Sequence, residues 1–203
     1  MSTACPDTLL LPIQLIAMDV DGVLTDGSIG WSADARGELS ELKCFDVQDG
    51  LGLSLVHCAG LQTAWITGRK SPLVARRAAE LQVSHLVQGA RDKGRVLTDL
   101  AAQLVLPHYA VLYIGDDLND LPAFEVAGVR VAVANAAEEV RARADWTTRR
   151  SGGRGAVREV IERVLTVQGR KHAAVEQFLD RLRTEQDSES GLLALPEGGS
   201  AGQ

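Results

Sequence analysis

The sequence has few aromatic residues and no excess of positive charge. Phe, Trp and Tyr together make up 4% of its 203 residues, which argues against a surface that stacks the bases of single-stranded nucleic acid. The formal net charge of −6 also argues against nucleic acid as a partner. A small phosphate ester is not excluded, because a local cation or metal can reverse the local field.

Cysteine is scarce as well, and no hydrophobic run is long. Cys5, Cys44 and Cys58 form no pair with the spacing of a metal site, which favours reduced thiols and a cytoplasmic location. The first residues have no basic segment, and the apolar run Leu9–Leu11 is too short for a signal peptide. No stretch approaches the roughly 20 apolar residues of a membrane span, so we expect no membrane partner.

Short apolar runs alternate with helical patterns along most of the chain. Such runs are typical of strands in a parallel sheet buried on both faces, and the alternation predicts a doubly wound α/β fold. We expect strands near 13–20, 62–67, 84–88, 110–115 and 129–134. We expect helices near 50–59, 72–82, 92–104, 119–127 and 154–168. Ser71 and Pro72 are expected to start the second of these helices.

Two segments break the alternation. Residues 25–46 contain several glycines and alternating side chains, which predicts a β-hairpin that projects from the domain. The tail from about residue 184 is rich in Ser, Glu and Gly, a composition typical of a flexible terminus. We therefore expect one domain over residues 9–168, followed over 169–203 by the end of a helix and a flexible tail.

Polar residues that suit phosphoryl transfer follow the predicted strands or open a predicted helix. They are Asp19 and Asp21, Thr67 with Gly68 and Arg69, Lys93, and Asp116 with Asp117 and Asp120. Ligands of doubly wound sheets bind outside the carboxyl ends of the strands. We therefore expect all these side chains to face one crevice.

The chemistry of these residues is complementary. A carboxylate can attack phosphorus and form an aspartyl-phosphate. Because the carboxylate and the phosphate repel each other, the attack requires a cation. Carboxylates from Asp19 and Asp116 suit Mg²⁺, and Lys93 adds a positive charge. The Thr67 hydroxyl can hold a phosphate oxygen, and Asp21 can act as general acid and then as general base.

At these residues the chain resembles the haloacid dehalogenase superfamily of phosphatases, which have a Rossmann-like fold. The resembling segments are Asp19–Val23, Thr67, Lys93 and Gly115–Asp120. The resemblance implies that Asp19 is the nucleophile and Asp21 the acid/base. It also implies that Asp19, Asp21 (through its backbone carbonyl) and Asp116 bind Mg²⁺, with Thr67 and Lys93 completing the catalytic set.

Many members of this superfamily have a cap domain over the site, and this chain has no room for one. The stretch from Asp19 to Thr67 holds only the predicted hairpin and one helix, and that from Thr67 to Lys93 only one helix and one strand. An open site offers few contacts to the rest of the substrate. The hairpin edge would also invite uncontrolled pairing unless it is covered. We therefore expect a homotetramer in which a neighbour completes each site.

Longer segments resemble phosphatases of 3-deoxy-D-manno-octulosonate 8-phosphate, which are capless, tetrameric and Mg²⁺-dependent. The segments are 19–27, 45–50, 66–70 and 152–159. The resemblance implies hydrolysis of this sugar phosphate to Kdo, a sugar acid of lipopolysaccharide, and a C-terminal tail that reaches a neighbour's site. It makes a group of residues candidate substrate contacts: Gln48, Asp49, Gly50, Thr67, Gly68, Arg69 and Arg154. Gln48 stands where that family usually has Arg, so one positive charge is missing here.

Three other functions fit parts of the pattern. Phosphatases of nonulosonate 9-phosphates, which are sialic-acid-like sugars, share most of these segments. A sugar-phosphate-binding module without catalysis would keep the fold, yet every motif residue is present. A phosphomutase would have to shield its phosphoaspartate from water, and the missing cap argues against that.

Overall fold

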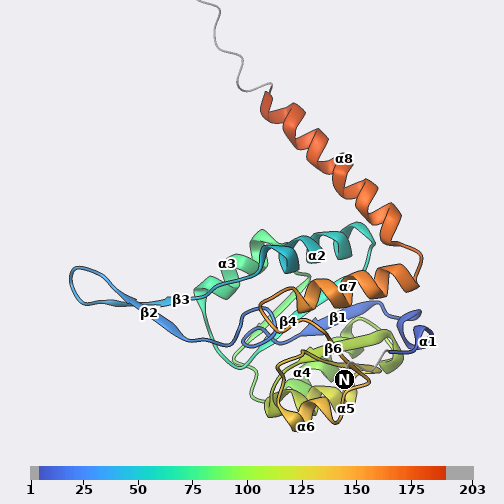
Figure 1. Cartoon of the computed structure of the whole chain (residues 1–203), viewed down its shortest axis with the longest axis horizontal. Coiled ribbons are helices and arrows are strands. Elements are labelled where there is room, and N and C mark those ends of the chain that lie inside the picture. The colour runs from blue at the N-terminus through green and yellow to red at the C-terminus, as the bar shows by residue number, and fades with distance from the viewer. Residues whose placement is uncertain (1–4, 191–203) are drawn as a thin grey trace, which may run out of the picture.

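The structure is a computed structural model that describes residues 5–190, with side chains described for residues 5–184. Its main sheet has six parallel strands in the order β5-β4-β1-β6-β7-β8, and β2 pairs with β3 in a separate antiparallel hairpin (Figure 1). The strands are β1 Leu15–Met18, β2 Gly30–Ala33, β3 Leu39–Leu42, β4 Gln62–Thr67, β5 His85–Gln88, β6 Val111–Gly115, β7 Val129–Ala132 and β8 Trp146–Thr147.

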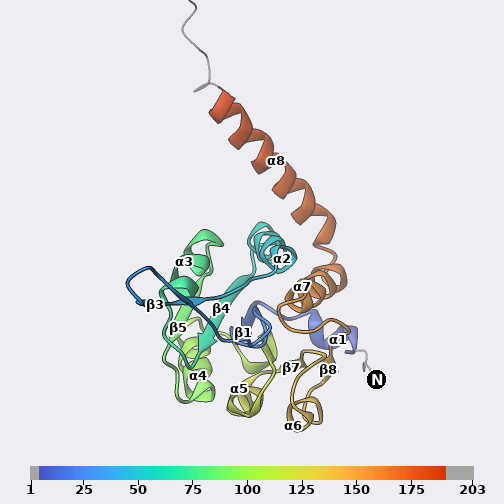
Figure 2. The same ribbon diagram turned by 60° about the vertical axis from the view of Figure 1, so that its left-hand side comes forward.

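Helices cover both faces of the sheet. Figure 2 shows α2, α3 and α7 on one face and α4, α5 and α6 on the other. The helices are α1 Asp7–Leu10, α2 Val47–Cys58, α3 Pro72–Glu80, α4 Lys93–Gln103, α5 Leu121–Val126, α6 Glu138–Arg141, α7 Ala156–Val167 and α8 Lys171–Ser190. Short 3₁₀ helices occur at η1 His108–Ala110 and η2 Leu118–Asp120. The predicted α/β class is therefore confirmed.

The core explains why these segments form strands. Every residue of β1 and β6 is buried, so an uninterrupted apolar run suits each strand better than an alternating one. On α7, Val157, Val160, Ile161 and Val164 are all fully buried. Their spacing forms the apolar stripe that packs a helix onto a sheet.

Most predicted elements are confirmed, and the differences have local causes. β8 and α6 were not predicted, because two and four residues are too few to show a period. α2 begins at Val47 instead of near residue 50, since the Asp46 side chain accepts a hydrogen bond from the backbone N–H of Gln48 at 2.7 Å and caps the helix. Pro72 is the first residue of α3 as expected, but the Ser71 side chain makes no capping bond.

The hairpin of β2 and β3 projects from the body of the domain (Figure 1). Several large apolar side chains on it are exposed to solvent: Ile29, Trp31, Leu39 and Leu42. Only this hairpin and α2 lie between β1 and β4, and only α3 lies between β4 and β5. Residues 5–190 therefore contain no cap domain, as predicted.

The C-terminal part of the described chain is the long helix α8. It packs against α2, buries Ala174 and then extends away from the body (Figure 1). The helix continues to Ser190, beyond the point near residue 184 where the flexible tail was expected to begin. The rest of that predicted tail, including the apolar segment 192–196, lies outside the described residues. None of the helices in residues 5–190 is long and apolar enough to cross a membrane.

The strand order creates a crevice beside β1. From β1 the chain proceeds to β4 on one side, while β6 and β7 lie on the other. Such a switch point in a parallel sheet leaves a gap at the carboxyl ends of the two central strands. Asp19 directly follows β1 and Asp116 directly follows β6, so both carboxylates flank this gap.

Candidate active site

The turn after β1 brings its two aspartates to the crevice. The backbone N–H of Asp19 donates to the carbonyl of Ile114 at 3.0 Å, which extends the β1–β6 pairing by one residue. Asp21 follows on the turn, and Gly22 then has φ +99°. A Cβ at position 22 would lie 2.0 Å from Oδ2 of Asp116. Backbone conformation and close approach therefore both require glycine here.

The loop after β6 is organised around the fully buried Asp120. Its Oδ1 accepts hydrogen bonds from Lys93 Nζ at 2.7 Å and from the Tyr113 hydroxyl at 2.9 Å. Its Oδ2 accepts from the backbone N–H groups of Asp116 at 2.8 Å and Asp117 at 3.2 Å. Four donors thus occupy this carboxylate, so Asp120 shapes the loop that presents Asp116.

Lys93 is the first residue of α4 and lies buried beneath the site. The Asp92 side chain caps α4 by accepting from the backbone N–H of Arg95 at 2.9 Å. The Nζ atom of Lys93 lies 2.9 Å from Oδ2 of Asp19. Burial lowers the pKa of Lys93, but the charges of Asp120 and Asp19 outweigh it and hold that pKa above its ordinary value. Lys93 is therefore a fixed positive charge in the site.

The site contains carboxylate oxygens that lack a partner. Carboxylate oxygens of Asp19, Asp116 and Asp120 lie within 4.8 Å of one another. Oδ1 of Asp19 and Oδ1 of Asp116 are buried and accept no hydrogen bond, which is unfavourable for an ionised group. Oxygen ligands of this kind suit a hard divalent cation such as Mg²⁺. Asp19 and Asp116 therefore fit the metal that the sequence predicted.

The pKa values of the two acids reflect the same crowding. The pKa of Asp19 is raised to about 7, mainly by burial and secondly by the negative charge of Asp120. Lys93 acts in the opposite direction but does not outweigh these two effects. Burial, and then Asp120 and Asp19, raises the pKa of Asp116 to about 8. Both carboxyl groups thus tend to hold protons near neutral pH, and a bound cation would displace those protons.

Thr67, at the end of β4, closes the other side of the crevice. Its hydroxyl donates to Oδ2 of Asp21 at 3.3 Å and accepts from the backbone N–H of Arg69 at 3.2 Å. The pocket above these residues has a volume of about 130 Å³. It is lined by Asp19, Asp21, Thr67, Gly68, Arg69, Asp116, Asp117 and Asn119. The structure therefore brings most of the predicted residues together, with Lys93 beneath them.

Comparison with known proteins agrees with this geometry. Residues 67–161 match the family of haloacid dehalogenase-like hydrolases. Over 167 residues the chain is 45% identical to the 3-deoxy-D-manno-octulosonate 8-phosphate phosphatase KdsC of Escherichia coli K12, covering 82% of this chain and 87% of the relative. This chain belongs to the KdsC family. The fold described above agrees with this membership.

Two solved structures of KdsC phosphatases are similar over nearly their full length. The Moraxella catarrhalis enzyme, solved with magnesium, phosphate and KDO, has a TM-score of 0.78 and 44% identity, covering 85% of this chain and 97% of that one. The cobalt-bound enzyme of Haemophilus influenzae has a TM-score of 0.76 and 38% identity, covering 84% and 99%.

In this KdsC family member the hairpin reaches into the site with two residues that sequence reasoning missed. Lys43 forms an ion pair with the carboxylate of Asp21, and its side chain is almost fully buried. Glu41 accepts hydrogen bonds from Arg69 Nη2 at 2.8 Å and from the Ser71 hydroxyl at 2.6 Å. The available signal was the pair of opposite charges at alternate positions 41 and 43, which places both side chains on one face of the strand.

Four predicted substrate contacts do not line the pocket. Asp49 is buried, and its carboxylate accepts from the backbone N–H groups of Arg158 at 2.7 Å and Gly155 at 3.3 Å, so it fastens α2 to the start of α7. Burial raises the pKa of Asp49 to about 6, although these two hydrogen bonds lower it. Gly50 is also buried outside the pocket, and an added Cβ there would lie 2.6 Å from the guanidinium of Arg77. The close contact with Arg77 therefore accounts for the glycine.

The other two, Gln48 and Arg154, are exposed residues outside the pocket. The side-chain oxygen of Gln48 accepts from Arg150 Nη1 at 2.5 Å. The guanidinium of Arg154 lies 3.5 Å from the carboxylate of Asp26, and its side chain is 72% exposed. Their part in substrate binding stays a prediction.

Proposed function

We propose that this chain is a Mg²⁺-dependent phosphatase that hydrolyses 3-deoxy-D-manno-octulosonate 8-phosphate to Kdo and phosphate, a step in making lipopolysaccharide precursors. The observation that carries the proposal is the pair of buried, unpartnered oxygens on Asp19 and Asp116, beside Asp21 and Thr67. Membership of the KdsC family supports the choice of substrate.

Metal binding involves residues on both sides of the crevice. Asp19 and Asp116 would hold Mg²⁺ through their carboxylates, and Asp21 through its backbone carbonyl. When bound, Mg²⁺ neutralises charge on the phosphate oxygens and on the attacking carboxylate. Lys93 supplies the second positive charge and fixes Asp19 through Oδ2.

The reaction has two steps, both performed by this chain's side chains. First, the carboxylate of Asp19 attacks phosphorus, the bond from phosphorus to the sugar oxygen breaks, and protonated Asp21 gives its proton to the leaving alkoxide. Then Asp21 takes a proton from a water that attacks the phosphoaspartate, which releases phosphate and restores Asp19. Thr67 and backbone N–H groups hold the phosphate oxygens, and Lys43 orients Asp21.

Phosphate release from purified sugar phosphates, with and without Mg²⁺, tests this function. We expect Mg²⁺-dependent release, with kcat/KM higher for the octulosonate 8-phosphate than for a nonulosonate 9-phosphate. A higher kcat/KM for the 9-phosphate would refute the proposed substrate but not the proposed phosphatase reaction. Asp19→Asn should abolish release with the fold intact, and unchanged release would refute the nucleophile.

The assembly we propose is a homotetramer in which a neighbour completes each site. The pocket of about 130 Å³ is small for a whole eight-carbon sugar phosphate, because sites for small molecules typically measure roughly 300–1,000 Å³. A groove of about 490 Å³ runs beside it, lined by Trp31 and Leu39 of the hairpin and by Arg69. Exposed apolar side chains of the hairpin favour burial against other copies.

Sedimentation at the assay concentration tests the assembly. Trp31→Glu should shift the protein to smaller species and raise KM, whereas Arg36→Glu at the hairpin tip should change neither. A fully active monomer of the unmodified protein would refute the tetramer.

The location we propose is the cytoplasm, where the thiols stay reduced. Cys5, Cys44 and Cys58 all lie in the described part of the chain and are unpaired there. Recovery of the protein with the soluble cell contents, and with free thiols, would support this location. Recovery in a secreted fraction would refute it.

A further inference from the structure

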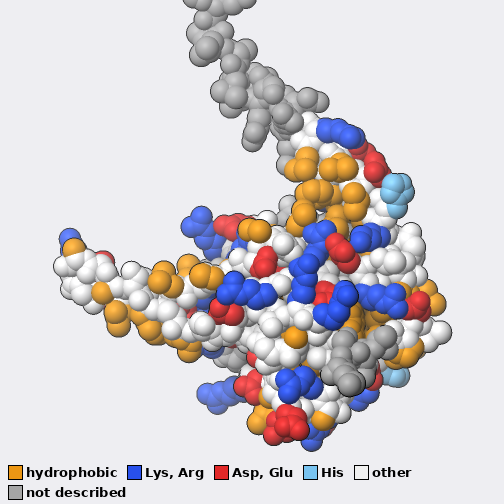
Figure 3. Space-filling view, viewed as in Figure 1, with side chains coloured by type: hydrophobic (Ala, Val, Ile, Leu, Met, Phe, Trp, Pro, Cys, Tyr) orange, Lys and Arg blue, Asp and Glu red, His pale blue; other side chains and the backbone are white. Residues whose placement is uncertain are grey.

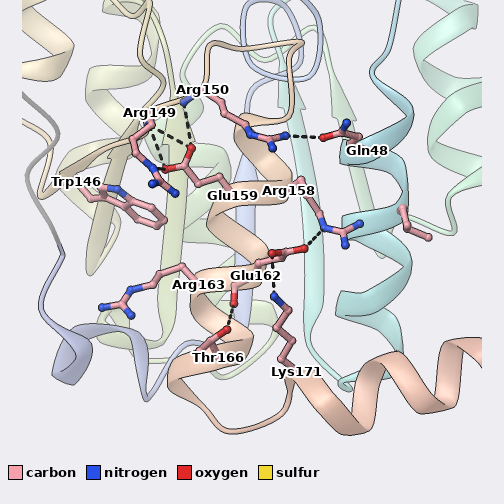
Figure 4. A pocket seen from close by; sticks show the side chains of 11 residues that line it. Gln48, Trp146, Arg149, Arg150, Arg158, Glu159, Glu162, Arg163, Thr166 and Lys171 are labelled. Carbon is pink, nitrogen blue, oxygen red and sulfur yellow. Dashed lines mark hydrogen bonds and ion pairs between the residues drawn. The ribbon is translucent and has the colours of Figure 1, made fainter.

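We propose that a second pocket, beside α7, binds a small polyanion with at least two phosphate or carboxylate groups. Its volume is about 500 Å³, within the range of roughly 300–1,000 Å³ of small-molecule sites. Three segments form it: α2, the stretch that leads from β8 to α7, and α7 with the start of α8 (Figure 4). None of its lining residues lines the active-site pocket. Gln48 is the one member of its lining that is also a predicted substrate contact, and the variants used below leave Gln48 unchanged.

The lining of this polyanion pocket is strongly basic. Five cationic side chains and two carboxylates line it: Arg149, Arg150, Arg158, Arg163 and Lys171, and Glu159 and Glu162. The pocket lining is positive although the whole chain has a net charge of −6. Figure 3 shows several of the Lys and Arg side chains gathered over the body of the domain beneath α8.

Both carboxylates in the pocket already have partners. Glu162 accepts from Arg158 Nε at 2.6 Å and from Lys171 Nζ at 2.9 Å. Glu159 accepts from the backbone N–H groups of Arg149 and Arg150, each at 3.1 Å. Five cationic side chains against these two carboxylates leave an excess of positive charge in the lining.

The arginines keep most of their donors free. The Arg150 side chain donates to the neutral side chain of Gln48 and forms no ion pair with a carboxylate among the described residues. Within residues 5–184, the Arg149 side chain donates only to Glu159, at 3.4 Å, and the Arg163 side chain pairs only with Asp7. A guanidinium has five N–H donors and binds phosphate or carboxylate through two at once. An anionic ligand would satisfy these donors.

The positions of the cations favour a ligand with more than one charged group. Arg149 and Arg150 precede the first residue of α7, while Lys171 follows its last (Figure 4). A helix of 12 residues is roughly 18 Å long. A single phosphate can meet the cations at only one end, whereas a polyanion can reach further along the pocket.

Calorimetric titration of the full chain tests the inference. The protein is first stripped of metal on a chelating resin, because tripolyphosphate and citrate themselves bind divalent cations and the heat of that reaction would mask binding to the protein. The probes are tripolyphosphate, citrate and a hexaglutamate peptide, at an ionic strength held constant with NaCl. We expect saturable binding of tripolyphosphate, of citrate or of both, which separates phosphate from carboxylate ligands. Absence of saturable binding, or binding of hexaglutamate alone, would overturn the proposal.

Variants locate the binding. The double variant Arg163→Gln with Lys171→Gln should weaken binding at least tenfold. Arg76→Gln is the matched control, an exposed arginine in an ion pair on α3, and should leave binding unchanged. Should circular dichroism show that the double variant is unfolded, Arg149→Gln replaces it, since that side chain is 82% exposed. Equal binding by the pocket variants and the control would overturn the proposal.

Discussion

The ammonium group of Lys93 lies 2.9 Å from Oδ2 of Asp19, and both side chains are almost fully buried. The same ammonium group lies 2.7 Å from Oδ1 of Asp120. One positive charge thus serves two buried carboxylates, and its removal would leave both without a cationic partner. Lys43 also lies close to two carboxylates, those of Asp21 and Glu41, but these are partly exposed, whereas both partners of Lys93 are buried.

Replacement of Lys93 by methionine should therefore damage both stability and activity. Removing one partner of a buried ion pair costs about 3–5 kcal/mol, and losing one transition-state charge partner lowers kcat roughly 10²–10³-fold. Urea unfolding and phosphate release measure the two effects. Arg95→Met is the control, because Arg95 is 81% exposed on the same helix, and both quantities should stay nearly unchanged. Full activity in Lys93→Met would contradict the assigned role.

Gly22→Ala should inactivate the enzyme through a steric clash. The new Cβ would lie 2.0 Å from Oδ2 of Asp116, and φ is +99°, so the carboxylate that we propose as a metal ligand would have to move. Gly37→Ala separates the two causes, because Gly37 has φ +80° but no atom within 4 Å of its Cβ position. Both variants should lose about 1–3 kcal/mol to backbone strain. Only Gly22→Ala should lose phosphate release, and equal activity in the two would refute the clash.

Mg²⁺ should stabilise the protein as well as activate it. At a concentration one hundred times its Kd, a bound ligand adds about 2.7 kcal/mol to the free energy of unfolding. Asp116→Asn should abolish this gain. Without metal, this variant should be more stable than the unmodified protein, because it removes an acid whose pKa is raised by burial and, after that, by the charges of Asp120 and Asp19. Thermal unfolding with and without Mg²⁺ measures both effects. Asp99→Asn, which changes a carboxylate 73% exposed on α4, should keep the full Mg²⁺ effect.

The central strands and their polar ends were predictable from the sequence because both signals are local. β1 and β6 are unbroken apolar runs, and Asp19 and Asp116 follow them directly. The topology of a parallel sheet then brings the strand ends together without any knowledge of side-chain packing. The pocket and its carboxylates could therefore be inferred before the structure.

The contributions that depend on tertiary packing could not be inferred in this way. Lys43 and Glu41 matter because the base of the hairpin folds against Asp21 and Arg69, a contact between distant segments. Asp49 had the sequence context of a substrate contact, yet α2 turns it towards the start of α7. The face of a helix that becomes buried is hard to read where glycines interrupt the apolar pattern, as they do in α2.

The buried Asp49 should give the folding stability a specific pH dependence. Its pKa is about 6 in the folded protein and about 3.9 when unfolded. Between these values the folded state holds a proton that the unfolded state has lost. The stability due to this group is thus fully present below pH 4 and is lost as the pH rises through 6. At about 1.36 kcal/mol per pKa unit, the loss amounts to at most about 3 kcal/mol.

Chemical unfolding from pH 4 to 7 tests this through the difference in stability between the unmodified protein and Asp49→Asn. As the pH rises, the free energy of unfolding of the unmodified protein should fall, relative to that of Asp49→Asn, by up to about 3 kcal/mol. Asp145→Asn should show a difference in stability that stays constant over this pH range. Burial raises the pKa of Asp145, but hydrogen bonds from Arg130 outweigh it and lower that pKa, so its stabilisation is present above pH 4 and is lost only in acid. A difference for Asp49→Asn that does not change with pH would mean that this carboxyl group titrates normally and is not held in the junction of α2 and α7.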